Sequence, residues 1–371
     1  MDYIVKNPED IYLGDDLKFQ TLNDLYNNLI SSIRKTVIYP MKKYIDKKEF
    51  NGHTYTEEIT EECRMCTAVC MRKKDSYFGR TLDVAFTYNE QITVMPRNFS
   101  LEFRHSMPLK SHYAMIGTAY VAGRYPLYYD ATNECGLSMA GLKYGEQTTY
   151  CEQKPGFENV ASFELIPKIL GNCKNLNDAR ALLKNINVTN ESYSDELKAT
   201  PLHWIISDKE ASIVLEPAKN GIRIYDNPAE ILTNAPEFGV HLGNYERYVV
   251  SETPANIVRM IPGDSSSESR FIRTAYNLRN SVCQDSENEC VGLFFHILDG
   301  VKKIKGCGTG RNQKYDITAY SSCCNINKGI YYYRTYTNSR ICAVDMMSEN
   351  LDNITLSSYP MIDVQLIYRQ N

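Results

Sequence analysis

The residues of this chain best suited to chemistry are a cysteine and two charged side chains that follow it. Cys66 begins a run typical of a β-strand, and Arg80 and Asp83 come shortly after it. The pattern is typical of a sulfur nucleophile with charged neighbours, and also of a buried structural thiol. Because the chain has 12 cysteines in 371 residues, spacing alone does not separate the two interpretations.

A cysteine whose own α-amino group is free carries a nucleophile and a base on one residue. An unperturbed α-amine titrates near pH ~8, close enough to neutrality to accept the thiol proton. In this chain the nitrogen of Cys66 is tied to Met65. The sequence therefore predicts that this peptide bond is broken, or never made, before the protein works.

Several short segments follow one another in a fixed order from residue 65 onward: 65–67, 78–83, 96–98, 133–137, 140–142, 202–208, 232–236, 262–264, 269–273 and 329–333. Through these segments the chain resembles the choloylglycine hydrolase family, which includes bile salt hydrolases and penicillin V acylases. The resemblance covers roughly residues 65–350. It implies an N-terminal-nucleophile amidase without a cofactor.

The resemblance implies roles for five residues. Cys66 matches the nucleophile, which attacks an amide carbonyl to give a thioester that water later hydrolyses. Asp83 matches the carboxylate that orients the α-amine, and Arg80 and Arg270 match two arginines whose positive charge favours the thiolate. Asn234 matches the residue that donates a side-chain N–H to the developing oxyanion, a contact worth about 3–4 kcal/mol in the transition state.

Without the resemblance, these residues have plainer explanations. Arg80 and Asp83 could form a solvated ion pair, which contributes little to stability. Asn234 stands before Ala-Pro, which is typical of a turn. Arg270 lies in a segment typical of an amphipathic helix. The ordered set of segments, and no single one of them, favours the catalytic roles.

Three further residues are expected to shape the substrate pocket. Lys143 stands where the family usually carries Asn or Tyr, and it can still serve the oxyanion through its backbone N–H. Its side chain would add a cation to the pocket wall, which favours acyl groups that carry a polar or anionic part. Tyr128 and Tyr129 precede the motif at Asn133, and we expect them to line the same pocket.

Hydrophobic periodicity predicts an α+β protein. Within the strand that starts at Cys66, even-numbered positions should share one face, which places Cys70 on the side of the nucleophile as a small core thiol. The resemblance implies a four-layer αββα sandwich, the fold of N-terminal-nucleophile hydrolases. Strands are predicted at 67–71, 77–82, 91–95, 112–116, 137–140, 202–207, 212–216, 222–225, 318–324, 329–336 and 341–346, and helices at 159–170, 177–185, 268–280 and 291–303.

The first 65 residues differ in character from the rest and form an N-terminal extension, with 66–371 as the amidase domain. An apolar stripe predicts a helix over residues 20–35 within this extension. The extension is a possible propeptide, removed by attack of the Cys66 thiol on the preceding carbonyl or by another protease. Translation could instead start at Met65, or the extension could stay, which would leave the catalytic base missing.

Composition excludes several classes of function. The chain has 41 basic and 45 acidic residues, a net charge of −4, and no long Lys/Arg run, so neither nucleic acid nor an anionic membrane is expected as a partner. It has no apolar stretch long enough for a membrane span and no secretory signal pattern, so we expect a cytoplasmic location. The cysteines lack zinc-finger spacing, so no metal site is expected.

These observations predict an amidase that cleaves a linear, non-peptide C–N bond in a small N-acyl amide. The resemblance implies a bile salt hydrolase-like activity and a homo-oligomer, with a tetramer as the family's form. A penicillin V acylase-like activity, or another N-acyl amide hydrolase activity, is the alternative. An alternative of another class is an inactive homologue that keeps its leader and binds small amphiphiles.

Overall fold

The computed structural model describes residues 65–85, 87–145, 148–250, 253–307 and 315–371, together with two short N-terminal strands. The chain divides into two units, residues 1–61 and 62–371. In the first unit, β1 (Ile11–Tyr12) pairs antiparallel with β2 (Lys18–Phe19). The helix predicted over residues 20–35 lies outside the described residues.

Two antiparallel sheets form the centre of the second unit. The six-stranded sheet has the order β14 (Ile231–Leu232), β3 (Met65–Arg72), β4 (Ser76–Val84), β15 (Ile317–Asn325), β16 (Ile330–Thr335), β17 (Cys342–Asp345). The eight-stranded sheet has the order β13 (Gly221–Asp226), β12 (Ser212–Ala218), β11 (Leu202–Ser207), β8 (Ser138–Lys143), β7 (Tyr125–Asn133), β6 (Met115–Ala122), β5 (Gln91–Met95), β18 (Ser357–Pro360). A separate parallel pair joins β9 (Glu158–Ala161) to β10 (Ile186–Thr189).

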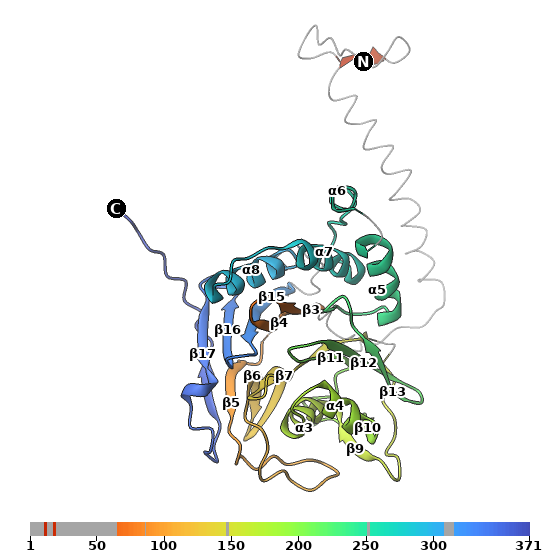
Figure 1. The fold of residues 1–371 in the computed structure, drawn as a ribbon, viewed down its shortest axis with the longest axis vertical. Coiled ribbons are helices and arrows are strands. Elements are labelled where there is room, and N and C mark those ends of the chain that lie inside the picture. The colour runs from red at the N-terminus through yellow and green to blue at the C-terminus, as the bar shows by residue number, and fades with distance from the viewer. Residues whose placement is uncertain are drawn as a thin grey trace, which may run out of the picture. The chain divides into compact units, whose positions relative to one another are not determined.

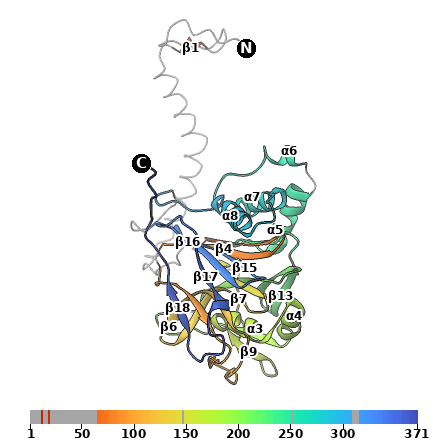
Figure 2. The same ribbon diagram turned by 60° about the vertical axis from the view of Figure 1, so that its left-hand side comes forward.

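Helices cover the outer face of each sheet, so the unit has four layers (Figures 1 and 2). The helices α7 (Ser267–Asn280) and α8 (Glu287–Asp299) pack on the six-stranded sheet, and α3 (Leu165–Asn172) packs on the eight-stranded sheet. This arrangement confirms the predicted αββα sandwich. The remaining helices and turns are α4 (Leu176–Leu183), α5 (Phe238–Asn244), α6 (Pro254–Ile257), η3 (Ser162–Glu164), η4 (Tyr245–Val250) and η5 (Met346–Ser348).

The alternation of side chains along β3 determines what each residue contacts. Cys66, Ala68 and Cys70 belong to the core between the two sheets. Val69 and Met71 belong to the core between the six-stranded sheet and α8. The predicted shared face of the even-numbered positions is therefore confirmed, because successive side chains of a strand point to opposite faces.

The start of helix α7 and its buried face follow from its sequence. Ser266 caps it by accepting a hydrogen bond from the backbone N–H of Ser269, and Glu268 lies in its first turn, where a negative charge is favourable. Its buried stripe includes Arg270 and Phe271. This stripe faces β3 and β14, which brings an arginine to the strand that carries Cys66.

The helix predicted at 159–170 and the strand predicted at 112–116 have different bounds in the structure. The helix predicted at 159–170 is strand β9 followed by a short turn and α3. Pro167 lies in the first turn of α3, where a missing N–H is tolerated, so the helix does not extend far before it. The strand predicted at 112–116 is β6, which begins only at Met115.

Strand β7 was missed altogether, and α8 begins earlier than predicted. Ser286 caps α8 by accepting a hydrogen bond from the backbone N–H of Glu289, so the helix starts at Glu287.

Within the described ranges, no helix is both long and apolar enough to cross a membrane.

Candidate active site

Cys66 lies at the second position of β3, with a side chain that is only 2% exposed. Its backbone is opposite Leu82 of β4, and its side chain points into the core between the sheets. The backbone N–H of Cys66 donates a 2.9 Å hydrogen bond to Oδ1 of Asn234. The thiol thus lies inside the protein, on a strand that is paired on both sides.

Arg270 of α7 connects three parts of the site. Its guanidinium donates 2.6 Å hydrogen bonds to the carbonyl oxygen of Cys66, to Oγ1 of Thr67 and to Oδ1 of Asn234. Burial lowers the pKa of Arg270, and the nearby groups Asp83 and Cys66 oppose that shift. The guanidinium nevertheless provides a positive charge next to the cysteine, because arginine stays protonated in proteins.

Asn234 is held by its backbone and by its side chain. Its Nδ2 donates to the carbonyl oxygen of Lys143 at 2.8 Å. Its backbone N–H donates to Oγ of Ser267, whose hydroxyl is also within hydrogen-bond distance of the Asn234 carbonyl, both at 2.9 Å. The ring Nε2 of His241 lies 3.0 Å from the same carbonyl. Burial lowers the pKa of His241, which keeps its ring neutral near pH 7.

Arg80 belongs to β4, and its side chain lies near Cys66 in the core between the two sheets. Its Nη1 donates to the carbonyl oxygens of Gly141 at 2.6 Å and Tyr129 at 3.1 Å. Its pKa is raised: burial acts to lower it, but the charges of Cys66 and Asp130, among others, outweigh burial. Arg80 is fixed by carbonyls of the eight-stranded sheet, although it belongs to the six-stranded one.

The glycine before Arg80 lets β15 approach this strand closely. A Cβ on Gly79 would lie 2.0 Å from the carbonyl oxygen of Ser322, so no larger residue fits without a backbone shift. The backbone N–H of Arg80 donates to Oγ of Ser322 at 3.1 Å. The Gly-Arg pair in the sequence therefore has a steric reason.

Asp130 is a buried acid near Arg80 that the sequence analysis did not identify. Its Oδ1 accepts a 2.9 Å hydrogen bond from Tyr320, and its Oδ2 accepts a 2.6 Å hydrogen bond from Tyr331. Burial raises the pKa of Asp130, and the charge of Arg80 acts to lower it. Asp130 lies on a strand that was itself not predicted, so no sequence signal marked it.

The two oxygens of Asp83 differ in their surroundings. Its Oδ1 accepts a 2.6 Å hydrogen bond from the hydroxyl of Thr318, while its buried Oδ2 has no hydrogen-bond partner among the described residues. Burial raises the pKa of Asp83 to about 6. Asp83 is paired across the strands with Met65, the residue whose carbonyl carbon is bonded to the nitrogen of Cys66. A buried acceptor without a donor is costly, and a cation or donor arriving there would be stabilised.

The structure separates the two tyrosines that were expected to line the pocket. Tyr129 packs against the core between the sheets, whereas Tyr128 belongs to the core on the outer face of the eight-stranded sheet. The pairing register of β6 and β7 shifts between Thr118 and Ala119, which leaves Tyr129 as an extra residue. An extra residue reverses the alternation of side chains, so the prediction that Tyr128 lines the site is wrong.

Lys143 ends β8, next to the site. Its carbonyl accepts the hydrogen bond from Asn234, and its neighbour across the strands is Leu202. The structure therefore places the backbone of Lys143 beside Asn234, which in turn contacts Arg270 and Cys66. The supporting residues Ser267 and His241 were missed, because only the fold of the chain places them behind Asn234.

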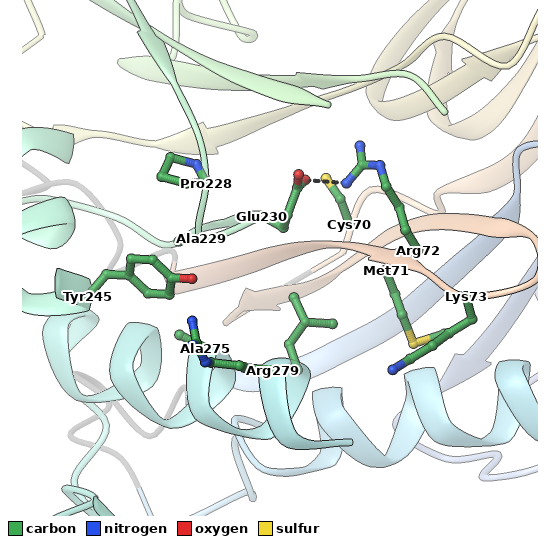
Figure 3. Close-up of a pocket in the computed structure, with 11 residues that line it drawn as sticks. Cys70, Met71, Arg72, Lys73, Pro228, Ala229, Glu230, Tyr245, Ala275 and Arg279 are labelled. Atoms are coloured by element: carbon green, nitrogen blue, oxygen red, sulfur yellow. Dashed lines mark ion pairs between the residues drawn. The ribbon is translucent and has the colours of Figure 1, made fainter. Parts of the chain in front are cut away.

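A separate pocket of about 230 Å³ lies beside the far end of β3 (Figure 3). Its lining includes Cys70, Tyr245 and Arg279, together with an ion pair of 2.6 Å between Arg72 and Glu230. Burial, and next the charge of Glu230, raises the pKa of Cys70 to about 12. Cys70 therefore stays a thiol at neutral pH, the less reactive form. The described part of the chain holds no cluster of three metal-ligating side chains.

The fold and site together define a class of protein. Two antiparallel sheets between helical layers, with a buried cysteine near the start of a central strand, are the architecture of an N-terminal-nucleophile hydrolase. Residues 66–359 match the family described as linear amide C–N hydrolases, choloylglycine hydrolase family. The chain belongs to this family and is an amidohydrolase of linear amides. The matched region begins at Cys66.

Curated relatives are similar over most of the chain. The chain is 40% identical over 324 residues to a bile salt hydrolase/transferase of Lactiplantibacillus plantarum, covering 83% of this chain and 100% of the relative. It is 33% identical over 317 residues to a bile salt hydrolase/transferase of Clostridium perfringens, covering 80% of this chain and 96% of the relative.

Solved structures are similar as well. A variant of the conjugated bile acid hydrolase from Clostridium perfringens superposes with a TM-score of 0.76 at 32% identity, covering 83% of this chain and 100% of that one. A penicillin V acylase from Agrobacterium tumefaciens superposes with a TM-score of 0.67 at 18% identity, covering 81% of this chain and 93% of that one. The second similarity shows the shared fold only.

Proposed function

We propose that this protein hydrolyses the amide bond of conjugated bile acids, with Cys66 as the nucleophile, once that residue has become the N-terminus. The relatives named for this activity match over nearly their whole length. The observation that supports the cysteine most is the contact of its backbone with Arg270, which lies in α7, and with Asn234, which lies between β14 and α5.

In this mechanism the sulfur of Cys66 attacks the carbonyl carbon of the substrate amide. The carbonyl oxygen becomes an oxyanion, which Asn234 stabilises with a side-chain N–H. The amide group of asparagine has two hydrogens, and the bond to Lys143 occupies one. The C–N bond then breaks, the amine leaves with a proton, and a thioester remains. Water attacks the thioester and releases the acid and the thiol.

The α-amine of Cys66 would serve as the base that takes the thiol proton and passes it to the leaving amine. In the chain with Met65 attached, that nitrogen is an amide whose hydrogen is donated to Asn234. Breaking the bond creates an amine beside the strand position of Asp83, whose Oδ2 has no partner in the described part of the chain. The free oxygen of Asp83 supports a role in holding that amine in its ammonium form.

Mass spectrometry combined with a hydrolysis panel tests this proposal. We expect the active protein to contain residues 66–371, a species of 306 residues that starts at Cys66. We expect it to release glycine or taurine from bile acid conjugates faster than it cleaves phenoxyacetyl or fatty-acyl amides. Full activity in a preparation that is entirely full-length would contradict the mechanism. Ligand binding without turnover would favour the inactive amphiphile-binding homologue.

Two further expectations from the sequence remain proposals. A homotetramer is the assembly that the resemblance implies, and light scattering of the purified protein measures it. A cytoplasmic location is the second, and cell fractionation with an antibody against this chain tests it.

A further inference from the structure

Two cysteines outside the active site lie with their sulfur atoms 2.8 Å apart. Cys283 lies in the connection between α7 and α8, and Cys290 lies in the first turn of α8. Both are free thiols, Cys283 partly exposed and Cys290 buried. The separation is shorter than van der Waals contact between two sulfur atoms, so the thiols face each other directly.

The surrounding backbone holds the two cysteines in this position. Lys73 and Lys74, in the turn between β3 and β4, donate through Nζ to the carbonyl oxygens of Ser281 at 2.8 Å and Asp285 at 3.4 Å. The cap at Ser286 fixes the start of α8. The connection is therefore anchored on both sides of Cys283, and bond formation between the sulfurs needs only a small local movement.

The other cysteines of the described chain lack such an arrangement. Cys323 and Cys324 are neighbours along β15, but Cys323 faces α8 whereas Cys324 faces the core between the sheets. Cys307 is exposed, and Cys66 and Cys70 are buried on one face of β3. Among the described cysteines, Cys283 and Cys290 are therefore set apart by the direct contact of their sulfur atoms.

We propose that Cys283 and Cys290 form a reversible disulfide when the protein meets a low-molecular-weight disulfide, and that this bond locks the connection between α7 and α8. The thiolate of Cys283 attacks one sulfur of the small disulfide and expels one thiol. The sulfur of Cys290 then attacks that of Cys283 and expels the second thiol. The protein dithiol is oxidised, the small disulfide is reduced to two thiols, and both protein protons end on them.

The order of the two steps follows from exposure. Cys283 is the accessible sulfur, so the small disulfide reaches it first. Burial, followed by the hydrogen bond and charge of Cys283, raises the pKa of Cys290 to about 11. Cys290 is therefore a thiol until its partner has reacted, and its proximity to Cys283 makes the closing step intramolecular.

The bond would affect the helix that positions Arg270. The connection it closes joins α7, which carries Arg270, to α8, which packs on β4 and β15. A disulfide across a loop restricts the unfolded chain more than the folded one. We therefore expect oxidation to raise the melting temperature by several degrees. This expectation is independent of the substrate assigned above.

Peptide mapping tests the bond directly. The tryptic peptide of residues 280–302 contains Cys283 and Cys290 and no other cysteine. After treatment of the full-length protein with oxidised glutathione and alkylation, we expect this peptide to be two hydrogens lighter than its reduced form and to carry no alkyl group. Dithiothreitol should restore two alkylation sites. Cys307→Ser, which removes the exposed cysteine, should leave the result unchanged.

The variant Cys283→Ser separates this bond from general thiol oxidation. We expect the same treatment to raise the melting temperature of the wild type but not that of Cys283→Ser. The proposal would be overturned if, after oxidised glutathione had fully modified Cys307, both cysteines of the peptide were still free to be alkylated. It would equally be overturned if each carried its own glutathione, because the pair would then not close.

Discussion

Arg270 donates a 2.6 Å hydrogen bond to the carbonyl oxygen of Cys66, across 204 residues of sequence. The contact joins helix α7 to β3, the strand that carries the nucleophile. Because the same guanidinium also donates to Oδ1 of Asn234, one side chain positions the backbone of Cys66 relative to the amide group of Asn234.

Replacing Arg270 with lysine should reduce kcat by about 10²-fold, because misplacing reacting groups by about 1 Å costs that much. Lysine keeps the positive charge but cannot make the planar set of contacts to Cys66, Thr67 and Asn234. Steady-state kinetics on a bile acid conjugate measures the effect. Arg279→Lys, at an exposed position of the same helix, is the matched control and should be close to wild type. Equal rates in the two variants would argue against the positioning role.

Replacing Cys66 with serine should lower turnover by at least ~10³-fold, because the hydroxyl is a much weaker nucleophile than the thiolate. If the extension is removed by the thiol itself, the variant should also remain full-length in mass spectrometry. Cys70→Ala removes a neighbouring buried thiol from the same face of β3 and should keep most of the activity. A fully active serine variant would refute the nucleophile assignment.

Replacing Asp83 with asparagine should stabilise the uncleaved chain at neutral pH while slowing catalysis. The folded pKa of Asp83 is about 6, raised from 3.8, so folding disfavours its charged form. The wild type therefore loses stability as pH rises from about 4 to about 6, by up to about 3 kcal/mol. Asparagine does not titrate and can still accept the hydrogen bond from Thr318.

Urea unfolding at pH 4 and pH 7.5 measures this effect. Both proteins, with Asp83 and with Asp83→Asn, carry Cys66→Ala so that they stay uncleaved. The two proteins should be similar at pH 4, and the asparagine variant should be more stable at pH 7.5. In the processed enzyme the ammonium group of Cys66 would stabilise the carboxylate, so the difference at pH 7.5 should shrink. A stability difference that does not change with pH would contradict the assignment.

Replacing Asp130 with asparagine should destabilise the protein by about 1–3 kcal/mol. The hydroxyls of Tyr320 and Tyr331 would no longer donate to a carboxylate, and the buried charge of Arg80 would no longer have this negative charge nearby. Denaturant unfolding measures the loss. Asp226→Asn, at an exposed end of β13, should change stability little. If both variants were equally stable, Asp130 would not be the counter-charge that supports Arg80.

Several strands of both sheets were predictable from local pattern. The predicted strand at 67–71 lies within β3, and those at 91–95 and 202–207 coincide with β5 and β11. Alternation along these strands follows from backbone geometry and needs no knowledge of the partner. Strand β7 escaped because its bulge at Tyr129 breaks the alternation on which such predictions depend.

The sequence by itself determined the nucleophile candidate, the face of β3 on which it lies and, through resemblance, the family. Only the tertiary structure decided that Tyr128 lies away from the site, that Asp130 lies beside Arg80 and that Oδ2 of Asp83 has no partner among the residues the structure describes. The first set depends on residue type, order and strand periodicity, which are local properties of the chain. The second depends on which side chains two sheets and a helix bring together, and no local pattern contains that information.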